Sequence, residues 1–256
     1  MNTHTIPWMK LKRRWLDIQA GRVEDPARLT EDRPEFRGAT IAQTTQWVER
    51  GYDLPGFTSG SVNFQPRKRR RAQWNNEQGR IDVTRALCGD ENYRLTRSPR
   101  EYRHGSTVEI GYGFRAGVDA ETIGQYGKFC AGIIRKLEGE GLDVAVDIVS
   151  RSISYIVGIR DECELKIRVK QVNERADFRA WSALFAPSGH RHLIFCGRSI
   201  HAEDVGRKVK PGMGGSQHRG WKVERDGDTI RIDCNSFRSG DPTSELETQA
   251  RTAGIL

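Results

Sequence analysis

The sequence predicts an α/β fold, because strand-like and helix-like hydrophobic patterns alternate through the middle of the chain. Residues 107–112 and 143–149 have strand patterns, and an apolar helical stripe from 123 to 137 separates them. Residues 164–172 alternate between apolar and charged side chains, which predicts a half-buried strand. A strand, a helix and a strand in this order predict a right-handed crossover between parallel strands.

The first element expected is a helix over residues 7–20, with Pro7 in its first turn and Gly21 just beyond its end. Lysine and arginine surround an apolar stripe that consists of Trp8, Leu11, Trp15 and Ile18. Such a helix docks on the protein's own core, on a protein partner or on an anionic surface, and the three remain open. Residues 1–36 comprise this helix and a linker. One prediction is that the helix contacts a protein partner through its two tryptophans.

Residues 37–106 form a second region, with an irregular and basic pattern. Thr40 and Gln43 match a capping box, which predicts a short helix that ends at Gly51. A further helical turn is expected near Asp82–Cys88. We therefore treat this stretch as a basic N-terminal region that precedes the core.

The α/β core is expected over residues 107–210. Asp119 is a good N-cap for the helix between the first two strands. That helix contains glycines at 124, 127 and 132, and each costs about 1 kcal/mol of helix propensity, so we expect them to permit close packing on the sheet.

Three further elements complete the predicted core. Shorter strands are expected at 153–157 and 192–196, and a helix capped by Asp177 that stops at Pro187. The strand at 164–172 points one set of side chains away from the core, and this set consists of Lys166, Arg168 and Lys170.

The C-terminal residues 211–256 are expected to hold a linker, a hairpin and a flexible tail. Glycines cluster at 212, 214 and 215, and residues 222–232 have a hairpin pattern with Asp226-Gly227 as its turn. The last 15 or so residues are polar with little to pack, which favours a mobile tail.

The charge of the chain indicates its partner class. Lysine and arginine number 42 against 34 aspartate and glutamate, which leaves a formal charge of +8. Residues 67–71 read Arg-Lys-Arg-Arg-Arg, and such a run either sits in water as a solvated loop or meets a polyanion. A basic run with a nearby tryptophan is typical of nucleic-acid binding, because phosphates pair with cations while bases stack. The predicted nucleic-acid-binding residues are Arg67, Lys68, Arg69, Arg70, Arg71, Trp74, Lys166, Arg168 and Lys170.

Nothing in the pattern indicates a recognition helix, so we expect largely sequence-independent binding to the DNA or RNA backbone. No stretch approaches the roughly 20 apolar residues of a membrane span, and charges interrupt the first apolar window, so no signal peptide is expected. The five cysteines include no CxxC pair, which is typical of free thiols in the cytoplasm. No cofactor is expected.

The stretch from Phe36 to about Gly197 resembles a family of unassigned function from phages and bacteria with a von Willebrand factor A-like core. The resemblance rests on the 107–149 unit, on Ala186-Pro187 before His192, and on short blocks upstream. These blocks are Arg37-Gly38-Ala39-Thr40 with Trp47 and Gly51-Tyr52, Arg69-Arg70-Arg71 with Trp74, and Ile81-Asp82 with Cys88-Gly89.

The resemblance implies a three-layer, Rossmann-like α/β core and a role as a binding or assembly module. Such domains often hold a divalent metal through an Asp-x-Ser-x-Ser step after the first strand. The matching residues 111–115 read Gly-Tyr-Gly-Phe-Arg and lack a carboxylate or hydroxyl at the ligand positions, so no metal site is expected. The leading hypothesis is a phage-associated, non-enzymatic module that binds nucleic acid or a nucleic-acid-bearing complex. A protein–protein adaptor or virion assembly component is the alternative.

A magnesium-dependent nuclease is the enzymatic alternative. The element order from Asp119 to Cys196 resembles the restriction-endonuclease-like core, in which two carboxylates hold Mg²⁺ beside a lysine. Asp147, Glu164 and Lys166 are the residues that fit, although Asp147 falls on the first of three strands instead of the second. Charged residues on the wet face of a strand are the competing interpretation.

Other catalytic patterns are weak or missing. His190 and His192 share a strand face if residues 192–196 are a strand, and His201 and Asp204 add metal-ligand types, but no fourth ligand has suggestive spacing. The sequence holds no phosphate-binding glycine loop and no GxSxG nucleophile motif.

Overall fold

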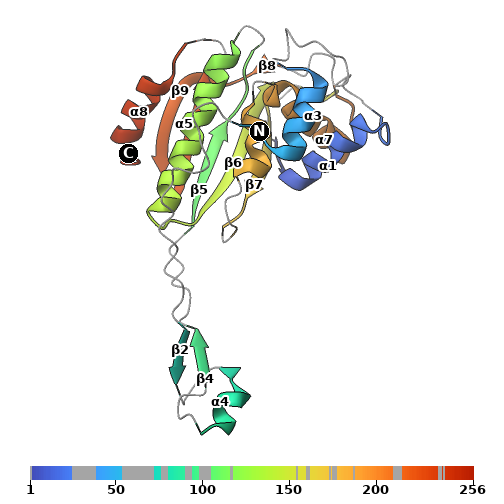
Figure 1. Ribbon diagram of the computed structural model, residues 1–256. Coiled ribbons are helices and arrows are strands. Elements are labelled where there is room, and N and C mark those ends of the chain that lie inside the picture. The colour runs from blue at the N-terminus through green and yellow to red at the C-terminus, as the bar shows by residue number, and fades with distance from the viewer. Residues whose placement is uncertain are drawn as a thin grey trace. The chain divides into compact units, whose positions relative to one another are not determined.

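The chain forms two compact units, each described here by itself (Figure 1). Unit 1 comprises residues 1–61 and 105–256, and unit 2 comprises residues 62–104. The computed structural model describes residues 2–24, 39–53, 72–75, 80–89, 94–97, 105–115, 118–153, 155–159, 162–172, 174, 178–186, 188–209, 215–235, 238 and 240–256.

Unit 1 is built on a mixed, mostly parallel sheet, which confirms the predicted α/β class. The strand order is β1-β7-β6-β5-β10-β9, and β8 adds to β6. β1 and β7, β5 and β6, and β5 and β10 run parallel, whereas β6 and β7, and β9 and β10, run antiparallel. The strands are β1 Asn2–Pro7, β5 Ser106–Gly111, β6 Val144–Ile153, β7 Glu162–Lys170, β8 Gly215–Ser216, β9 Arg219–Asp226 and β10 Thr229–Asn235.

The predicted crossover between parallel strands is confirmed. Helix α5, Ala120–Gly139, connects β5 to the adjacent parallel β6. Asp119 caps it, because its carboxylate accepts a 2.7 Å hydrogen bond from the Thr122 N–H. The expected packing of its glycines on the sheet is wrong. At Gly127 a Cβ would lie 2.9 Å from the Phe185 side chain, and at 124 and 132 it would meet nothing within 4 Å.

The helices of unit 1 pack on one face of the sheet. Figure 1 shows α5 in front of β5 and α8 beside β9, and α5 and α8 also contact each other. The Tyr126 hydroxyl of α5 lies 2.7 and 2.8 Å from the carbonyl oxygens of Gly111 and Ile232. A Cβ at Gly197 of α7 would touch Leu165 of β7, which places α7 on the same face. Within the described ranges the helices form a single layer, so the expected three-layer core is not seen there. Besides α5, unit 1 contains α1 Trp8–Gln19, α3 Ile41–Arg50, α6 Phe178–Trp181, a 3-10 turn Ser182–Phe185, a π-helical turn His190–Ile194, α7 Phe195–Asp204 and α8 Thr243–Thr252.

The N-terminal helix docks on the protein's own core. Trp8 is 4% exposed and Trp15 is fully buried, and the Trp15 indole N–H donates to Thr45 Oγ1 of α3 at 3.2 Å. The prediction of a protein partner contacted through the two tryptophans is therefore wrong. The capping box of Thr40 and Gln43 is confirmed. Strand β1 was not expected, and it pairs in parallel with β7.

Two predicted core strands are wrong. β6 continues to Ile153, and the stretch after it contributes an isolated bridge between Ile156 and Val209. Residues 192–196 are helical, and His192, Leu193, Ile194 and Cys196 are all buried. A short run that is buried on every side has no periodicity to separate a helix from a strand. Asp177, the predicted cap of the preceding helix, lies outside the described residues.

The C-terminal residues belong to the core and form no flexible tail. β10 pairs with β5, so that Ile230 faces Val108 across the ladder, and β9 forms the edge beyond it. Residues 243–252 form α8, and Leu246 is fully buried. The hairpin turn is Gly227-Asp228, with Gly227 at a φ of 57°, one residue later than predicted. These contacts correct the expected boundary at 210/211.

Unit 2 contains a small antiparallel sheet in the order β2-β4-β3 and the short helix α4. The Asp82 carboxylate caps α4 by accepting a 3.1 Å hydrogen bond from the Arg85 N–H, as the predicted turn requires. The region expected to be irregular thus includes regular structure. Its elements are β2 Ala72–Asn75, β3 Arg80–Ile81, α4 Val83–Leu87 and β4 Arg94–Arg97.

Candidate functional site

The sheet face opposite the helices carries a lattice of charged side chains, which we call the charged face. Side chains alternate along each strand, so the residues between the apolar core positions point to this face. Most are half-buried and paired with a side chain of opposite charge on another strand of the sheet. The charged face consists of Glu109, Asp147, Arg151, Glu164, Lys166, Arg168, Arg231 and Asp233.

Glu109 is the centre of this lattice. Its carboxylate accepts hydrogen bonds from Lys166 Nζ at 2.5 Å and from Arg231 Nε at 3.1 Å. Burial raises the pKa of Glu109, but the hydrogen bonds and charges of these two cations outweigh it and lower the pKa overall. Lys166 also lies 3.6 Å from Glu164. Both residues of the predicted nuclease set on β7 are therefore already engaged with other side chains.

The other predicted phosphate-binding cations of β7 are also paired with carboxylates. Arg168 donates hydrogen bonds from two guanidinium nitrogens to the carboxylate of the buried Asp147, with Nη2 2.8 Å from Oδ2. Lys170 is 2% exposed and lies 3.2 Å from carboxylates of both Glu138 and Asp143. A cation with a close carboxylate partner contributes little net attraction to a phosphate, and Lys170 is buried too deeply to reach one.

The structure does not bring Asp147 and Glu164 together. In the β6–β7 ladder Asp147 is opposite Arg168 and Glu164 is opposite Arg151, so the two carboxylates sit four residues apart along the strands. At about 3.4 Å per residue their backbone positions are roughly 14 Å apart along the strands. A single Mg²⁺ needs its ligands within about 2.1 Å, so these two carboxylates do not form one magnesium site.

A histidine–aspartate pair, His218 and Asp233, lies beside Gly111. Gly111 begins the stretch 111–115 that corresponds to the metal-binding step of von Willebrand A-like domains. The Arg151 backbone N–H donates to His218 Nε2 at 3.3 Å, so Nδ1 carries the hydrogen and donates to Asp233 at 3.2 Å. Burial raises the pKa of Asp233, but His218 and Arg151 outweigh it and lower the pKa. A Cβ at Gly111 would lie 2.1 Å from Asp233 Oδ1, so only glycine leaves room for the pair.

Sequence reasoning missed His218, because a single histidine after a glycine-rich stretch carries no spacing signal. Both of its ring nitrogens are engaged, one by a strand backbone and one by a carboxylate. The pair therefore joins the ends of β6 and β10 and is not arranged to transfer a proton.

The other histidines whose side chains the structure describes do not converge on a metal. His192 Nδ1 lies 2.8 Å from Thr44 Oγ1, whereas His201 bonds the Tyr155 hydroxyl and stacks on His4 at 4.4 Å. Asp204 lies 3.0 Å from His4 Nε2. Throughout the described ranges, no three histidine, cysteine, aspartate or glutamate side chains form a cluster able to hold a metal ion.

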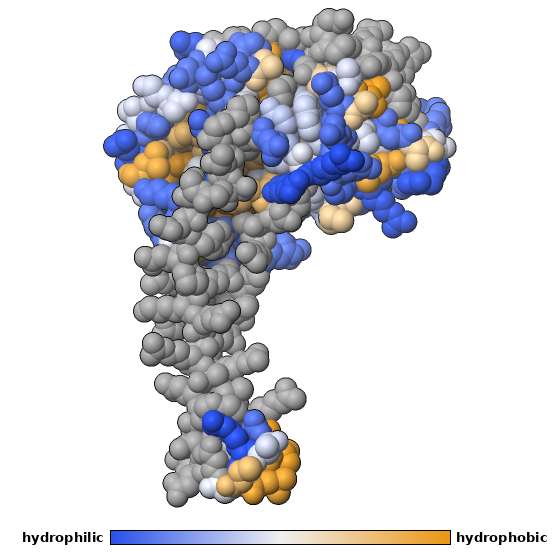
Figure 2. Space-filling view, viewed as in Figure 1, coloured by the Kyte–Doolittle hydropathy of each residue, from blue (hydrophilic) through white to orange (hydrophobic). Residues whose placement is uncertain are grey.

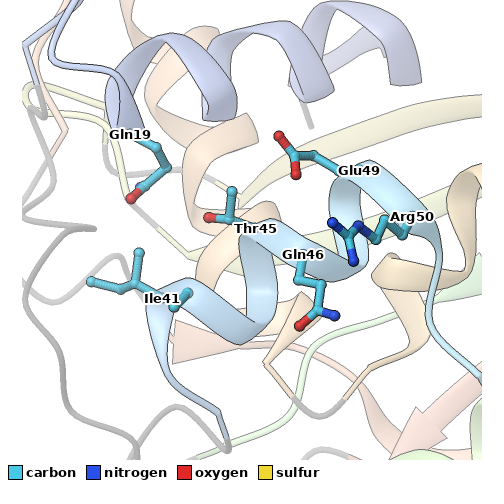
Figure 3. A pocket seen from close by; sticks show the side chains of 7 residues that line it. Gln19, Ile41, Thr45, Gln46, Glu49 and Arg50 are labelled. Carbon is cyan, nitrogen blue, oxygen red and sulfur yellow. The ribbon is translucent and has the colours of Figure 1, made fainter.

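The surface of α3 has an open groove beside the end of α1 (Figure 3). Among the described residues its lining includes one carboxylate, Glu49, and one guanidinium, Arg50, but no histidine or cysteine. Thr45 in this lining is also the acceptor for the buried Trp15 indole. The groove is therefore a space left where α1 and α3 pack together. Among its described lining residues, only Glu49 and Arg50 are charged.

The excess positive charge of the chain is concentrated in unit 2. Its 43 residues contain eleven lysine and arginine against five aspartate and glutamate, a formal charge of +6 out of +8 for the whole chain. Residues 67–71, the predicted basic contact run, lie outside the described residues. Trp74 belongs to β2.

The lengths of the helices and the state of the cysteines are two further findings. Of the helices that the structure describes, none is both long and apolar enough to cross a membrane. The five cysteines are free, with Cys88 exposed and the other four buried.

Comparisons with known proteins complete the description of the site. No curated protein and no solved structure matches the chain. A family model described as "Domain of unknown function (DUF7192)" matches residues 10–255 and so covers elements of both units. The chain therefore belongs to the DUF7192 family.

Proposed function

We propose that this protein is a non-enzymatic, phage-associated module that binds nucleic acid, or a complex bearing nucleic acid, in the cytoplasm. The observation that carries the proposal is the segregation of charge. Unit 2 has a formal charge of +6 in 43 residues, whereas the rest of the chain has +2 in 213. A small unit with this charge attracts a polyanion by releasing its counterions, without reading sequence.

The pairing on the charged face sharpens the assignment of the contact surface. Lys166, Arg168 and Lys170 each have a carboxylate partner, so we assign the phosphate contacts to the run at 67–71 in unit 2. Trp74 follows the run closely in sequence and is the proposed stacking residue. Unit 1 then acts as the folded body that carries unit 2.

We further propose that unit 1 is a variant of the von Willebrand A-like fold. The parallel β5–α5–β6 crossover and the buried Tyr126 at its centre support this relation. The antiparallel pairing of β6 with β7 and the single layer of described helices mark it as a variant. A metal at the end of β5 forms no part of the proposal, because Asp233 and His218 fill the space beside Gly111.

Salt-dependent binding tests the proposed function. The variant replaces Arg67, Lys68, Arg69, Arg70 and Arg71 with serine, and fluorescence anisotropy measures affinity for labelled duplex DNA between 50 and 200 mM salt. We expect weaker binding and a flatter salt dependence, by about 0.9 in the log–log slope for each lost phosphate contact.

A matched control removes the same formal charge from unit 1. It replaces five exposed cations with serine, namely Arg13, Lys128, Lys208, Arg219 and Arg251. This control should keep most of the affinity and slope. Equal losses of affinity in both variants would mean that only the net charge of the chain matters. Binding to an acidic protein but to no nucleic acid would favour the adaptor alternative.

A further inference from the structure

Unit 2 presents aliphatic side chains to solvent as well as positive charge. Leu87 is 83% exposed, Val83 is 64% exposed and Ile81 is 48% exposed. Figure 2 shows orange, hydrophobic atoms gathered on the surface of the described part of this unit, next to blue ones. Large apolar side chains left in water by so small a unit mark a contact surface, because a unit of this size has few apolar groups to spare for a core.

Helix α4 holds two of these side chains in a fixed arrangement. Val83 and Leu87 are four residues apart, so they lie side by side on one face of the helix. The Asp82 carboxylate fixes the start of that helix through its bond to the Arg85 N–H. Ile81 precedes the cap at the end of β3. The result is a short apolar ridge on a strongly basic unit.

We propose that unit 2 binds duplex nucleic acid and inserts Leu87, flanked by Val83, between neighbouring base pairs. This inference rests on the proposed function and names its substrate class. The formal charge of the unit, +6, is opposite in sign to that of the phosphate backbone. Aliphatic wedges partly unstack a base step and kink the duplex, and the bend brings more basic surface into contact.

The chemistry of the ridge favours a duplex over other anionic partners. Single strands are held by stacking on a series of flat aromatic side chains, and Ile81, Val83 and Leu87 have no aromatic face. The stacking proposed for Trp74 is then on a base exposed at the opened step. Binding to an anionic membrane surface uses a long amphipathic helix, whereas α4 has five residues. A base step needs only one or two protruding aliphatic groups, which is what α4 offers.

The test combines affinity with DNA bending, using the full chain with Val83→Ala and Leu87→Ala. Both side chains are exposed and alanine is the best helix former, so the variant leaves the folding of α4 intact, as far-UV circular dichroism verifies. A duplex labelled at both ends reports bending by energy transfer. We expect wild type to shorten the end-to-end distance. The variant should lose this bend and roughly tenfold in duplex affinity. Its salt slope should flatten only by the phosphate contacts that the bend had added, and so less than in the 67–71 serine variant.

Met9→Ala is the matched control, because Met9 is 66% exposed but belongs to α1 in unit 1. It should alter neither the bend nor the affinity. If the Val83/Leu87 variant bends and binds the duplex like wild type while the 67–71 serine variant loses salt dependence, insertion is wrong but the proposed function stands. An equal loss on single-stranded RNA also overturns insertion. Binding to phosphatidylserine vesicles without duplex binding, or no nucleic-acid binding at all, overturns both.

Discussion

The Gln249 side chain on α8 hydrogen-bonds the outer edge of strand β9 at Val223. Its carbonyl oxygen accepts from the Val223 N–H at 2.8 Å, and its amide donates to the Trp221 carbonyl at 3.0 Å. One glutamine thus occupies the place of a further strand on an edge of the sheet. Covering an edge in this way satisfies buried backbone groups and blocks pairing with another chain.

Replacing Gln249 with alanine should lower the free energy of unfolding by about 1–3 kcal/mol, because two backbone groups at β9 lose their partners. Urea denaturation measures this change. Thr248→Ala is the control, since the exposed Thr248 side chain bonds only a carbonyl of its own helix. Equal stability of the Gln249 variant and wild type would mean that water replaces the amide without cost.

Gly111→Ala should destabilise unit 1, because the new Cβ would lie 2.1 Å from Asp233 Oδ1 and 2.9 Å from the His218 ring. We expect a loss of about 1–3 kcal/mol, the usual cost of overpacking. Gly220→Ala is the control, since a Cβ there meets nothing within 4 Å. If the two variants unfold at the same urea concentration, the Asp233–His218 pair moves aside freely.

Stability should fall in mild acid because of His201. Burial, together with the charge of His4, lowers the pKa of His201 to about 4 against the opposing charge of Asp204. In the unfolded chain His201 binds a proton near pH 6.5, whereas in the folded chain it does not. The stability that the neutral His201 contributes is therefore fully present above pH 6.5. It is lost as the pH falls towards 4, by at most about 1.4 kcal/mol per pH unit.

His201→Gln isolates this contribution from the carboxylates that titrate in the same range. Urea denaturation at pH 7.5 and pH 4.5 should show a smaller drop in stability for the variant than for wild type. Glutamine keeps a polar group near the Tyr155 hydroxyl and carries no titrating proton. The same drop in both proteins would show that His201 takes up its proton in the folded state.

Adding Mg²⁺ should leave the Tm almost unchanged, since only an ion bound better by the folded chain raises stability. Asp147 and Glu164 are held by Arg168 and Arg151 at separate points of the β6–β7 ladder. Thermal unfolding with Mg²⁺ and with a chelator measures the difference. Metal-dependent cleavage of DNA or RNA that Glu164→Ala abolishes would instead establish the nuclease and give Lys166 a catalytic role.

The sequence by itself determined the local elements whose signals involve neighbouring residues. The Asp119 cap, the capping box of Thr40 and Gln43, the stripe of α5 and the alternation of β7 all follow from spacings of two to four residues. These spacings reflect the helical and strand periods, which act at every position regardless of the rest of the fold.

Only the tertiary structure decided which elements meet. β10 lies beside β5, and β1 beside β7, because distant segments bury apolar surface together, and no local spacing encodes that choice. The same pairing decides the candidate site. In the sequence, Lys166 and Arg168 look like unpaired cations on the solvent-facing side of a strand. The register of β7 against β6 places Arg168 opposite Asp147, and β5, on the other side of β6, supplies Glu109 to Lys166. Whether a charge is available to a ligand depends on its neighbours across the sheet, which the order of residues along one strand does not contain.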